Sequence, residues 1–165
     1  MRDHGGDLDR AKSHFGGTDW IDLSTGTNPV AYPVDPIDHT ALATLPTKED
    51  VAALEQIAAQ AYGTQSSLVA LGGAQAAIQL VPRLMVPGTA KVLAPTYNEH
   101  AAALRAQGWP VCEVSTLPEL AGADLAIVVN PNNPDGRRWR PEELGAPADT
   151  TGLLVVDESF ADPKP

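Results

Sequence analysis

The sequence predicts an α/β protein with helices on both faces of a mostly parallel sheet. Segments with helical spacing of apolar residues alternate along the chain with short apolar runs. Two of these runs, Leu125–Val129 and Leu153–Val156, are apolar at every position. Continuous runs of this kind are typical of parallel strands that are buried on both faces. We therefore expect a three-layer α/β/α arrangement.

Residues 1–40 are expected to form an amino-terminal arm, and residues 41–165 a separate domain. Two glycine pairs, Gly5-Gly6 and Gly16-Gly17, interrupt the periodic patterns of the arm, as do three prolines further on. One short helix is predicted between the glycine pairs, over residues 8–14.

The domain opens with a predicted helix over residues 48–61. Thr47 and Asp50 have the spacing of a capping box, in which each side chain accepts a hydrogen bond from the backbone N–H of the other residue. Apolar residues then recur at helical spacing until Gly63, where the helix should end.

Beyond this helix the pattern alternates between strands and helices, as expected for parallel strands joined by helical crossovers. In such sheets ligands bind beyond the carboxyl ends of the strands, so candidate functional residues are sought there. The predicted strands are 67–71, 91–94, 111–114, 125–130 and 153–157, and the predicted helices are 74–84, bent near Pro82, and 97–107.

Charge and cysteine content narrow the function classes. Lys and Arg number 11 against 21 Asp and Glu, a formal net charge of −10, so neither nucleic acid nor an anionic membrane is an expected partner. No apolar stretch approaches the roughly 18 residues of a membrane span, and the amino terminus is polar. A cytoplasmic location is therefore expected. The single cysteine, Cys112, excludes an internal disulfide and a thiolate metal cluster.

The run Gly72-Gly73-Ala74-Gln75 follows a predicted strand and opens a predicted helix. Backbone N–H groups at a helix amino terminus attract anions, so this run is a candidate phosphate site. A glycine turn without a ligand is the alternative, because the G-x-G-x-x-G pattern of dinucleotide sites is missing. Tyr97 follows the next strand and either stacks on a flat ligand or packs as an ordinary tyrosine.

Two further runs follow buried strands. Asn130-Pro131-Asn132-Asn133-Pro134-Asp135-Gly136 combines three amides with two prolines and a glycine, more constraint than a purely structural turn needs. Asp157 ends an apolar strand, where a carboxylate pays for desolvation unless a cation or hydrogen-bond donors meet it. A structural salt bridge and a cationic ligand group are both open as its partner.

These runs, in this order and spacing, resemble the large domain of pyridoxal 5'-phosphate (PLP) enzymes of the aspartate-aminotransferase fold, fold type I. The resemblance implies PLP as cofactor, with its phosphate held by Gly73, Ala74 and Gln75. It implies that Tyr97 stacks on the pyridine ring and that Asn133 donates to the ring's phenolate oxygen. Asp157 would pair with the protonated ring nitrogen, which keeps the ring a strong electron sink.

The arm narrows the resemblance. His4-Gly5-Gly6, followed by Trp20–Pro29, is similar to the threonine-phosphate decarboxylases of cobalamin biosynthesis and to their relatives, the histidinol-phosphate aminotransferases. The His-Gly-Gly opening favours the decarboxylases. So does Phe160, where many aminotransferases carry a tyrosine.

This likeness implies a small phosphorylated amino acid, O-phospho-L-threonine, as substrate and aminopropanol phosphate as product. It also implies an intact enzyme that is a homodimer. The residues expected near the substrate are His4, Gly5, Gly26, through its backbone, and Asn28.

The Schiff-base lysine of these enzymes lies in a Ser-x-x-Lys segment well beyond the strand that ends at the aspartate. Lys164 follows Asp157 too closely to match it. We therefore expect residues 41–165 to be the amino-terminal part of a PLP-binding large domain, without a catalytic residue of their own and inactive alone. Two alternatives remain: part of a histidinol-phosphate-type aminotransferase, or a non-catalytic α/β module that binds another phosphate ligand at Gly73–Gln75.

Overall fold

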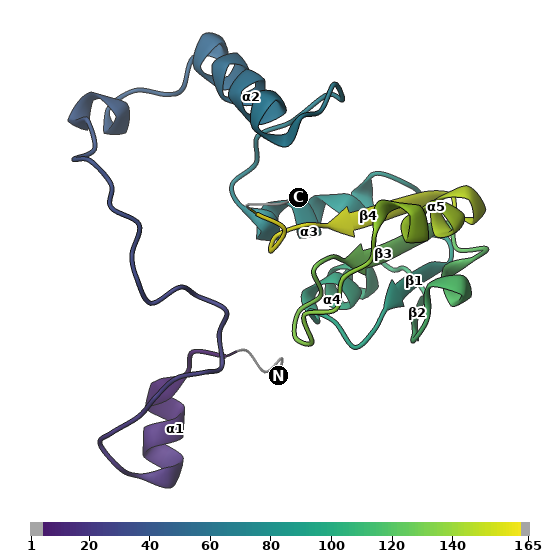
Figure 1. Cartoon of the computed structure of the whole chain (residues 1–165), viewed down its shortest axis with the longest axis horizontal. Helices are drawn as coiled ribbons and strands as arrows, with labels where there is room; N and C mark the ends of the chain where they lie inside the picture. Colours follow the sequence, from purple (N-terminus) through teal and green to yellow (C-terminus); the bar gives the residue numbers. More distant parts are fainter. Residues whose placement is uncertain (1–4, 163–165) are drawn as a thin grey trace. The chain divides into compact units, whose positions relative to one another are not determined.

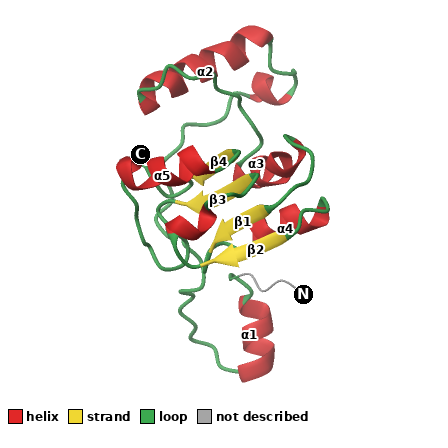
Figure 2. Cartoon of the chain, turned by 90° about the vertical axis from the view of Figure 1, so that its right-hand side faces the viewer, coloured by secondary structure: helices red, strands yellow, loops and turns green. Residues whose placement is uncertain are grey.

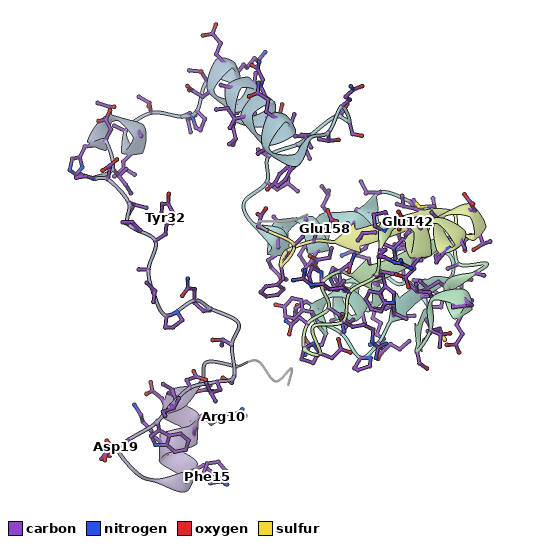
Figure 3. All side chains as sticks on the ribbon, viewed as in Figure 1. Arg10, Phe15, Asp19, Tyr32, Glu142 and Glu158 are labelled. Carbon is purple, nitrogen blue, oxygen red and sulfur yellow. The ribbon has the colours of Figure 1, made fainter. Side chains whose placement is uncertain are left out.

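The structure, a computed structural model, describes residues 5–162 and divides the chain into two units, Met1–Thr47 and Lys48–Pro165. The first unit holds helix α1, Leu8–Phe15, and the 3-10 helix η1, His39–Leu42, joined by a long segment without regular structure (Figure 1). None of residues 5–47 is buried, and Tyr32, labelled in Figure 3, is 84% exposed. The predicted short helix is confirmed as α1.

The second unit contains a four-stranded sheet in which every pair of neighbouring strands is parallel, as predicted. The strand order is β2-β1-β3-β4. Its elements are α2 (Lys48–Tyr62), α3 (Ala74–Leu80), η2 (Val81–Arg83), β1 (Ala90–Leu93), α4 (Glu99–Ala106), β2 (Val111–Val114), η3 (Leu117–Leu120), β3 (Leu125–Val129), α5 (Pro141–Thr150) and β4 (Leu153–Asp157).

Both faces of the sheet are covered, which confirms the three-layer prediction. Leu125 and Ile127 of β3 pack on one face with Leu104 of α4, while Ala126 and Val128 pack on the other, with η3 and α5 against it. Figure 2 shows α5 on one side of the strands and α3 and α4 on the other. Side chains alternate between the faces of a strand, so the unbroken apolar run of β3 supplies both cores.

Helix α2 begins directly after Thr47, as the capping pattern predicts, and ends before Gly63, whose φ of +62° suits a helix carboxyl terminus. The helix predicted over residues 74–84 changes at the expected proline: α3 ends at Leu80, and the 3-10 helix η2 with Pro82 follows it. The Trp109 indole N–H donates to the Pro82 carbonyl oxygen at 2.9 Å, so this turn is held by a buried side chain.

One predicted strand is wrong. Residues 67–71 have no regular structure, and the sheet of the described residues consists of the four strands above. A strand is stable only when its backbone N–H and C=O groups pair with a neighbour, and no strand within residues 5–162 pairs with this run. Val69 is therefore 70% exposed and Leu71 43% exposed.

One predicted helix start changes, and one helix is new. The helix expected from Tyr97 begins at Glu99, with Asn98 at its N-cap position. Helix α5 was not predicted at all, since Gly145 and Pro147 lie inside it. The helix begins at Pro141, and the Glu143 carboxylate caps it by accepting from the Arg140 N–H at 2.9 Å.

Among the helices of residues 5–162, none has the length and apolar character that a membrane crossing requires.

The packing on the α4 face generates a stability prediction. Leu104 is fully buried between α4 and the sheet, so Leu104→Ala should lower the free energy of unfolding by about 2–5 kcal/mol through lost burial and a cavity. Urea unfolding followed by circular dichroism measures the change. Leu84→Ala is the matched control, because Leu84 is 58% exposed. Equal effects of the two substitutions would contradict this packing.

Candidate functional site

The candidate site lies where the carboxyl ends of β1, β3 and β4 meet. These strands are neighbours and parallel, so the loops that follow them begin at one edge of the sheet. The Asn130 N–H donates to the Asp157 carbonyl oxygen at 2.8 Å, which places the start of the loop after β3 beside the end of β4. Glu158, labelled in Figure 3, is the first residue beyond β4.

The Asp157 side chain makes three hydrogen bonds at this edge of the sheet. Its Oδ2 lies 2.7 Å from Nε2 of His100, and the two side chains are 13% and 4% exposed. Its Oδ1 accepts from the N–H and the hydroxyl of Ser159, at 2.9 and 2.6 Å. The carboxylate therefore meets an imidazole and two further donors of its own fold. The open alternatives for its partner are resolved in part, since no arginine pairs with it within the described residues.

These contacts hold the Asp157 carboxyl in its ionised form. The hydrogen bond from His100, followed by those from Ser159, lowers the pKa of Asp157 to about 2, against the opposing effect of burial. Because an ionised carboxylate can only accept, His100 Nε2 carries the proton between them. A carboxylate offers about four acceptor positions, and three are occupied here. One remains for a donor from a ligand.

Tyr97 contacts the His100 ring of the Asp157–His100 pair. The rings of Tyr97 and His100 are 6.4 Å apart between centroids and meet edge to face, at 85°. An imidazole that is held by Asp157 thus also supports the tyrosine ring. This geometry connects two of the predicted site residues, Tyr97 and Asp157, which are 60 positions apart in the sequence.

The glycine run at the start of α3 has the expected form. Gly73, with φ of +87°, precedes the first residue of the helix, a conformation that favours glycine. The N–H groups of Ala74 and Gln75 lie in the first turn, where a helix offers no acceptor for them. The Gln75 side chain donates to Glu99 Oε2 at 3.4 Å, which ties α3 to the first turn of α4.

A cavity of about 270 Å³ joins the glycine run to the carboxylate. Ala74, His100, Asp157 and Ser159 all line it, together with apolar residues of α3 and β4. The structure therefore brings one end of the predicted phosphate loop and the predicted cation-binding carboxylate to a single cavity. Tyr97 and Asn133 are not among its lining residues.

The loop after β3 contains two neighbouring amides with different surroundings. Asn132 is buried and makes three side-chain hydrogen bonds, to Thr96, Pro95 and Asp135. Asn133 is half-buried, and no side-chain hydrogen bond joins it to another described residue. Asn133 therefore keeps its amide available for a ligand, whereas Asn132 does not.

The predicted substrate residues belong to the first unit, where one contact joins two of the segments. The Gly6 N–H donates to Ser24 Oγ at 2.8 Å, and a Cβ on Gly5 would overlap the Ser24 carbonyl oxygen. Asp22 Oδ1 accepts from both the hydroxyl and the N–H of Ser24, and these bonds lower the pKa of Asp22. Gly5 and Gly6 thus lie against Ser24, which is two residues before Gly26 in the sequence.

The other substrate candidates contribute less. Asn28 Oδ1 accepts from the Val30 N–H at 2.9 Å, so this side chain closes a local turn. His4 lies outside the described residues. Gly26 is exposed.

Sequence reasoning missed His100, which the structure makes the principal partner of Asp157. The available signal was a polar residue within an apolar stretch of a predicted helix, since His100 is near Ala101, Ala103 and Leu104 in the sequence. The structure shows all four residues buried, and a buried polar side chain needs a hydrogen-bond partner. Glu99 and Ser159 were missed as well. Within residues 5–162, no group of three or more His, Cys, Asp or Glu side chains could hold a metal ion.

Comparison with known proteins gives consistent matches. The model of the family "Aminotransferase class I and II" matches residues 18–163. A threonine-phosphate decarboxylase of Pseudomonas aeruginosa is 41% identical over 100% of this chain and 52% of its own length. The chain spans about half the length of the curated relatives it matches.

Solved structures match the fold over about two thirds of the chain. The L-threonine-O-3-phosphate decarboxylase of Porphyromonas gingivalis aligns with a TM-score of 0.56 and 25% identity, over 68% of this chain and 39% of that one. The histidinol-phosphate aminotransferase of Sinorhizobium meliloti, solved with pyridoxal 5'-phosphate, aligns with a TM-score of 0.61 and 25% identity, over 69% and 36%.

The lowered pKa of Asp157 predicts a pH dependence of stability. A carboxylate stabilised in the folded state contributes above its unfolded-state pKa of about 3.9, and the contribution disappears as the pH falls through about 2. The difference in unfolding free energy between the wild type and Asp157→Asn should therefore be largest above pH 4 and shrink toward pH 2. Urea unfolding at each pH measures it, with Asp149→Asn, an exposed aspartate of α5, as control. A difference that stays constant down to pH 2 would contradict the assignment.

Proposed function

Because the chain belongs to the aminotransferase class I and II family, we propose that it forms the PLP-binding part of a threonine-phosphate decarboxylase. The observation that carries the proposal is the ionised Asp157, held by His100 at the end of β4 and facing the cavity that begins at Ala74. The 41% identity to a decarboxylase over the whole chain supports this choice of reaction.

The donors and acceptors of this edge fit the cofactor. A carboxylate with a free acceptor position suits a protonated ring nitrogen. The half-buried Asn133 amide, which no described residue occupies, suits the ring's phenolate oxygen. The Tyr97 ring, supported by His100, offers a face for stacking. The first-turn N–H groups of Ala74 and Gln75 suit a phosphate.

PLP, when bound, supplies an electron sink for the electrons left at the substrate Cα when a bond to that carbon breaks. The residues of this chain set the conditions for it. Asp157 would keep the proton on the ring nitrogen, because its lowered pKa leaves the carboxylate charged at neutral pH. His100 orients that carboxylate with its own N–H. Asn133 would donate to the ring's phenolate oxygen.

The substrate would be O-phospho-L-threonine, with the α-carboxylate as the group lost. The contact of Gly5-Gly6 with Ser24 supports a role for the arm, because it gathers the residues before Gly26 with the amino-terminal glycines. Phe160 supports decarboxylation over transamination, because a phenyl ring has no hydroxyl to donate to the phenolate oxygen. Asn133 alone would then donate to that oxygen.

The cofactor site is tested by titration of the chain with pyridoxamine 5'-phosphate, which has the PLP ring and phosphate but no aldehyde to react with surface lysines. Asp157→Ala removes a charged hydrogen bond and should weaken binding about 10–100-fold. Asn133→Ala removes a neutral one and should weaken binding about 3–10-fold. Asp149→Ala should match the wild type. Equal affinities for all four proteins would favour the non-catalytic phosphate-binding module.

The reaction is tested in a chimera that joins this chain to the part of the Pseudomonas aeruginosa decarboxylase beyond the match. We expect the chimera to release CO₂ from O-phospho-L-threonine and the chain alone to release none, since the resemblance places the cofactor-linked lysine outside it. Asp157→Ala in the chimera should abolish release. A folded, PLP-loaded chimera that instead transaminates histidinol phosphate would overturn the choice of decarboxylase.

A further inference from the structure

We propose that Asn132 is a positioning residue, which sets the placement of Tyr97 relative to Asn133 by joining the loop after β1 to the loop after β3. The claim rests on the proposed function insofar as Tyr97 and Asn133 are taken to face the cofactor ring. The joining of the two loops is a property of the chain by itself.

The side chain of Asn132 is fully used. It is 6% exposed, its Oδ1 accepts from Thr96 Oγ1 at 2.6 Å, and its Nδ2 donates to the Pro95 carbonyl oxygen at 2.9 Å and to Asp135 Oδ1 at 2.8 Å. Both amide hydrogens and the amide oxygen therefore have partners. A buried amide that is satisfied in this way holds its neighbours, because moving any of them leaves a polar group unpaired.

The backbone of Asn132 is engaged too. Its N–H donates to the Arg137 carbonyl oxygen at 2.7 Å, and its carbonyl oxygen accepts from the Gly136 N–H at 2.8 Å. Asp135 Oδ1 also accepts from the Arg137 N–H at 2.9 Å. The backbone of Asn132 thus bonds within the loop after β3. Its side chain bonds to Pro95 and Thr96 of the loop after β1.

The two partners in the other loop lie immediately before Tyr97. Pro95 and Thr96 are 37 and 36 positions from Asn132 in the sequence, yet they follow β1, the direct neighbour of β3 in the sheet. Because Tyr97 is bonded to Thr96 and Asn133 to Asn132, these two hydrogen bonds connect the candidate stacking ring with the candidate amide donor.

The asparagine amide supplies the one acceptor and the two donors that this set of bonds needs. Aspartate would lose both donors and would place a second carboxylate beside Asp135. Leucine would leave the Pro95 carbonyl oxygen and the Thr96 hydroxyl without a partner. The neighbouring Asn133 shows the contrast, because no side-chain hydrogen bond joins it to another described residue: the first amide positions the loops and the second is available to a ligand.

The first test needs no cofactor. Hydrogen exchange of the full chain is measured by mass spectrometry for wild type, Asn132→Asp and Asp135→Asn. Asn132→Asp should speed exchange at least about threefold in residues 94–98 as well as 132–137, because it removes the donor to Pro95. Asp135→Asn still accepts from Asn132, so residues 94–98 should exchange at the wild-type rate. Faster exchange confined to 132–137 in Asn132→Asp would overturn the proposal.

A second pair of variants serves if Asn132→Asp does not fold. Thr96→Val removes the hydroxyl that Asn132 accepts from, and Thr96→Ser keeps it. Thr96→Val should speed exchange in residues 132–137 and weaken binding of pyridoxamine 5'-phosphate about tenfold. Thr96→Ser should stay within about twofold of the wild type on both measures. Identical behaviour of the two variants would overturn the proposal.

The two readouts separate this proposal from the proposed function. A wild-type chain that binds no pyridoxamine 5'-phosphate would overturn the cofactor assignment, while the exchange data would still decide whether Asn132 couples the loops. Normal binding that is unaffected by Asn132→Asp, together with unchanged exchange in residues 94–98, would leave the cofactor assignment standing and overturn the positioning role.

Discussion

The hydrogen bond between Asp157 and His100 is the interaction on which the candidate site depends. A carboxylate at the end of a half-buried strand loses much of its hydration, and it stays ionised only if donors replace the water. His100 and Ser159 supply those donors. The same bond ties the last residue of β4 to the first turn of α4, so the charge and the position of Asp157 have one cause.

The first turn of α4 and the residues just before it gather the other parts of the site. Glu99 accepts from Gln75 beside the glycine run, and Thr96 donates to Asn132 beside the free amide. The helix itself is anchored by Leu104, packed against β1 and β3. The apolar packing of α4 on the sheet therefore fixes the positions of the polar side chains at the sheet edge. Functional loops are usually positioned by a rigid scaffold in this way.

Several elements were predictable because their signals are local. The strands 111–114 and 153–157 occur as predicted, since short runs with β-branched residues between turn residues are typical of strands. The position of Asp157 at a strand end was predictable for the same reason. The run 67–71 has an equally apolar pattern but no partner strand in the described part of the chain, and α5 carries two helix breakers that its capping and burial overcome.

By itself the sequence determined the α/β class, the order of most elements and the residues placed at the carboxyl ends of the strands, because hydrophobic periodicity and turn chemistry act over a few neighbouring residues. The tertiary structure alone decided which polar groups meet. His100 faces Asp157 across 57 positions, and Asn132 rather than Asn133 bonds to Thr96. Such pairs depend on how α4 and three strands pack together. The local sequence pattern around each residue does not predict a partner that is distant in the sequence.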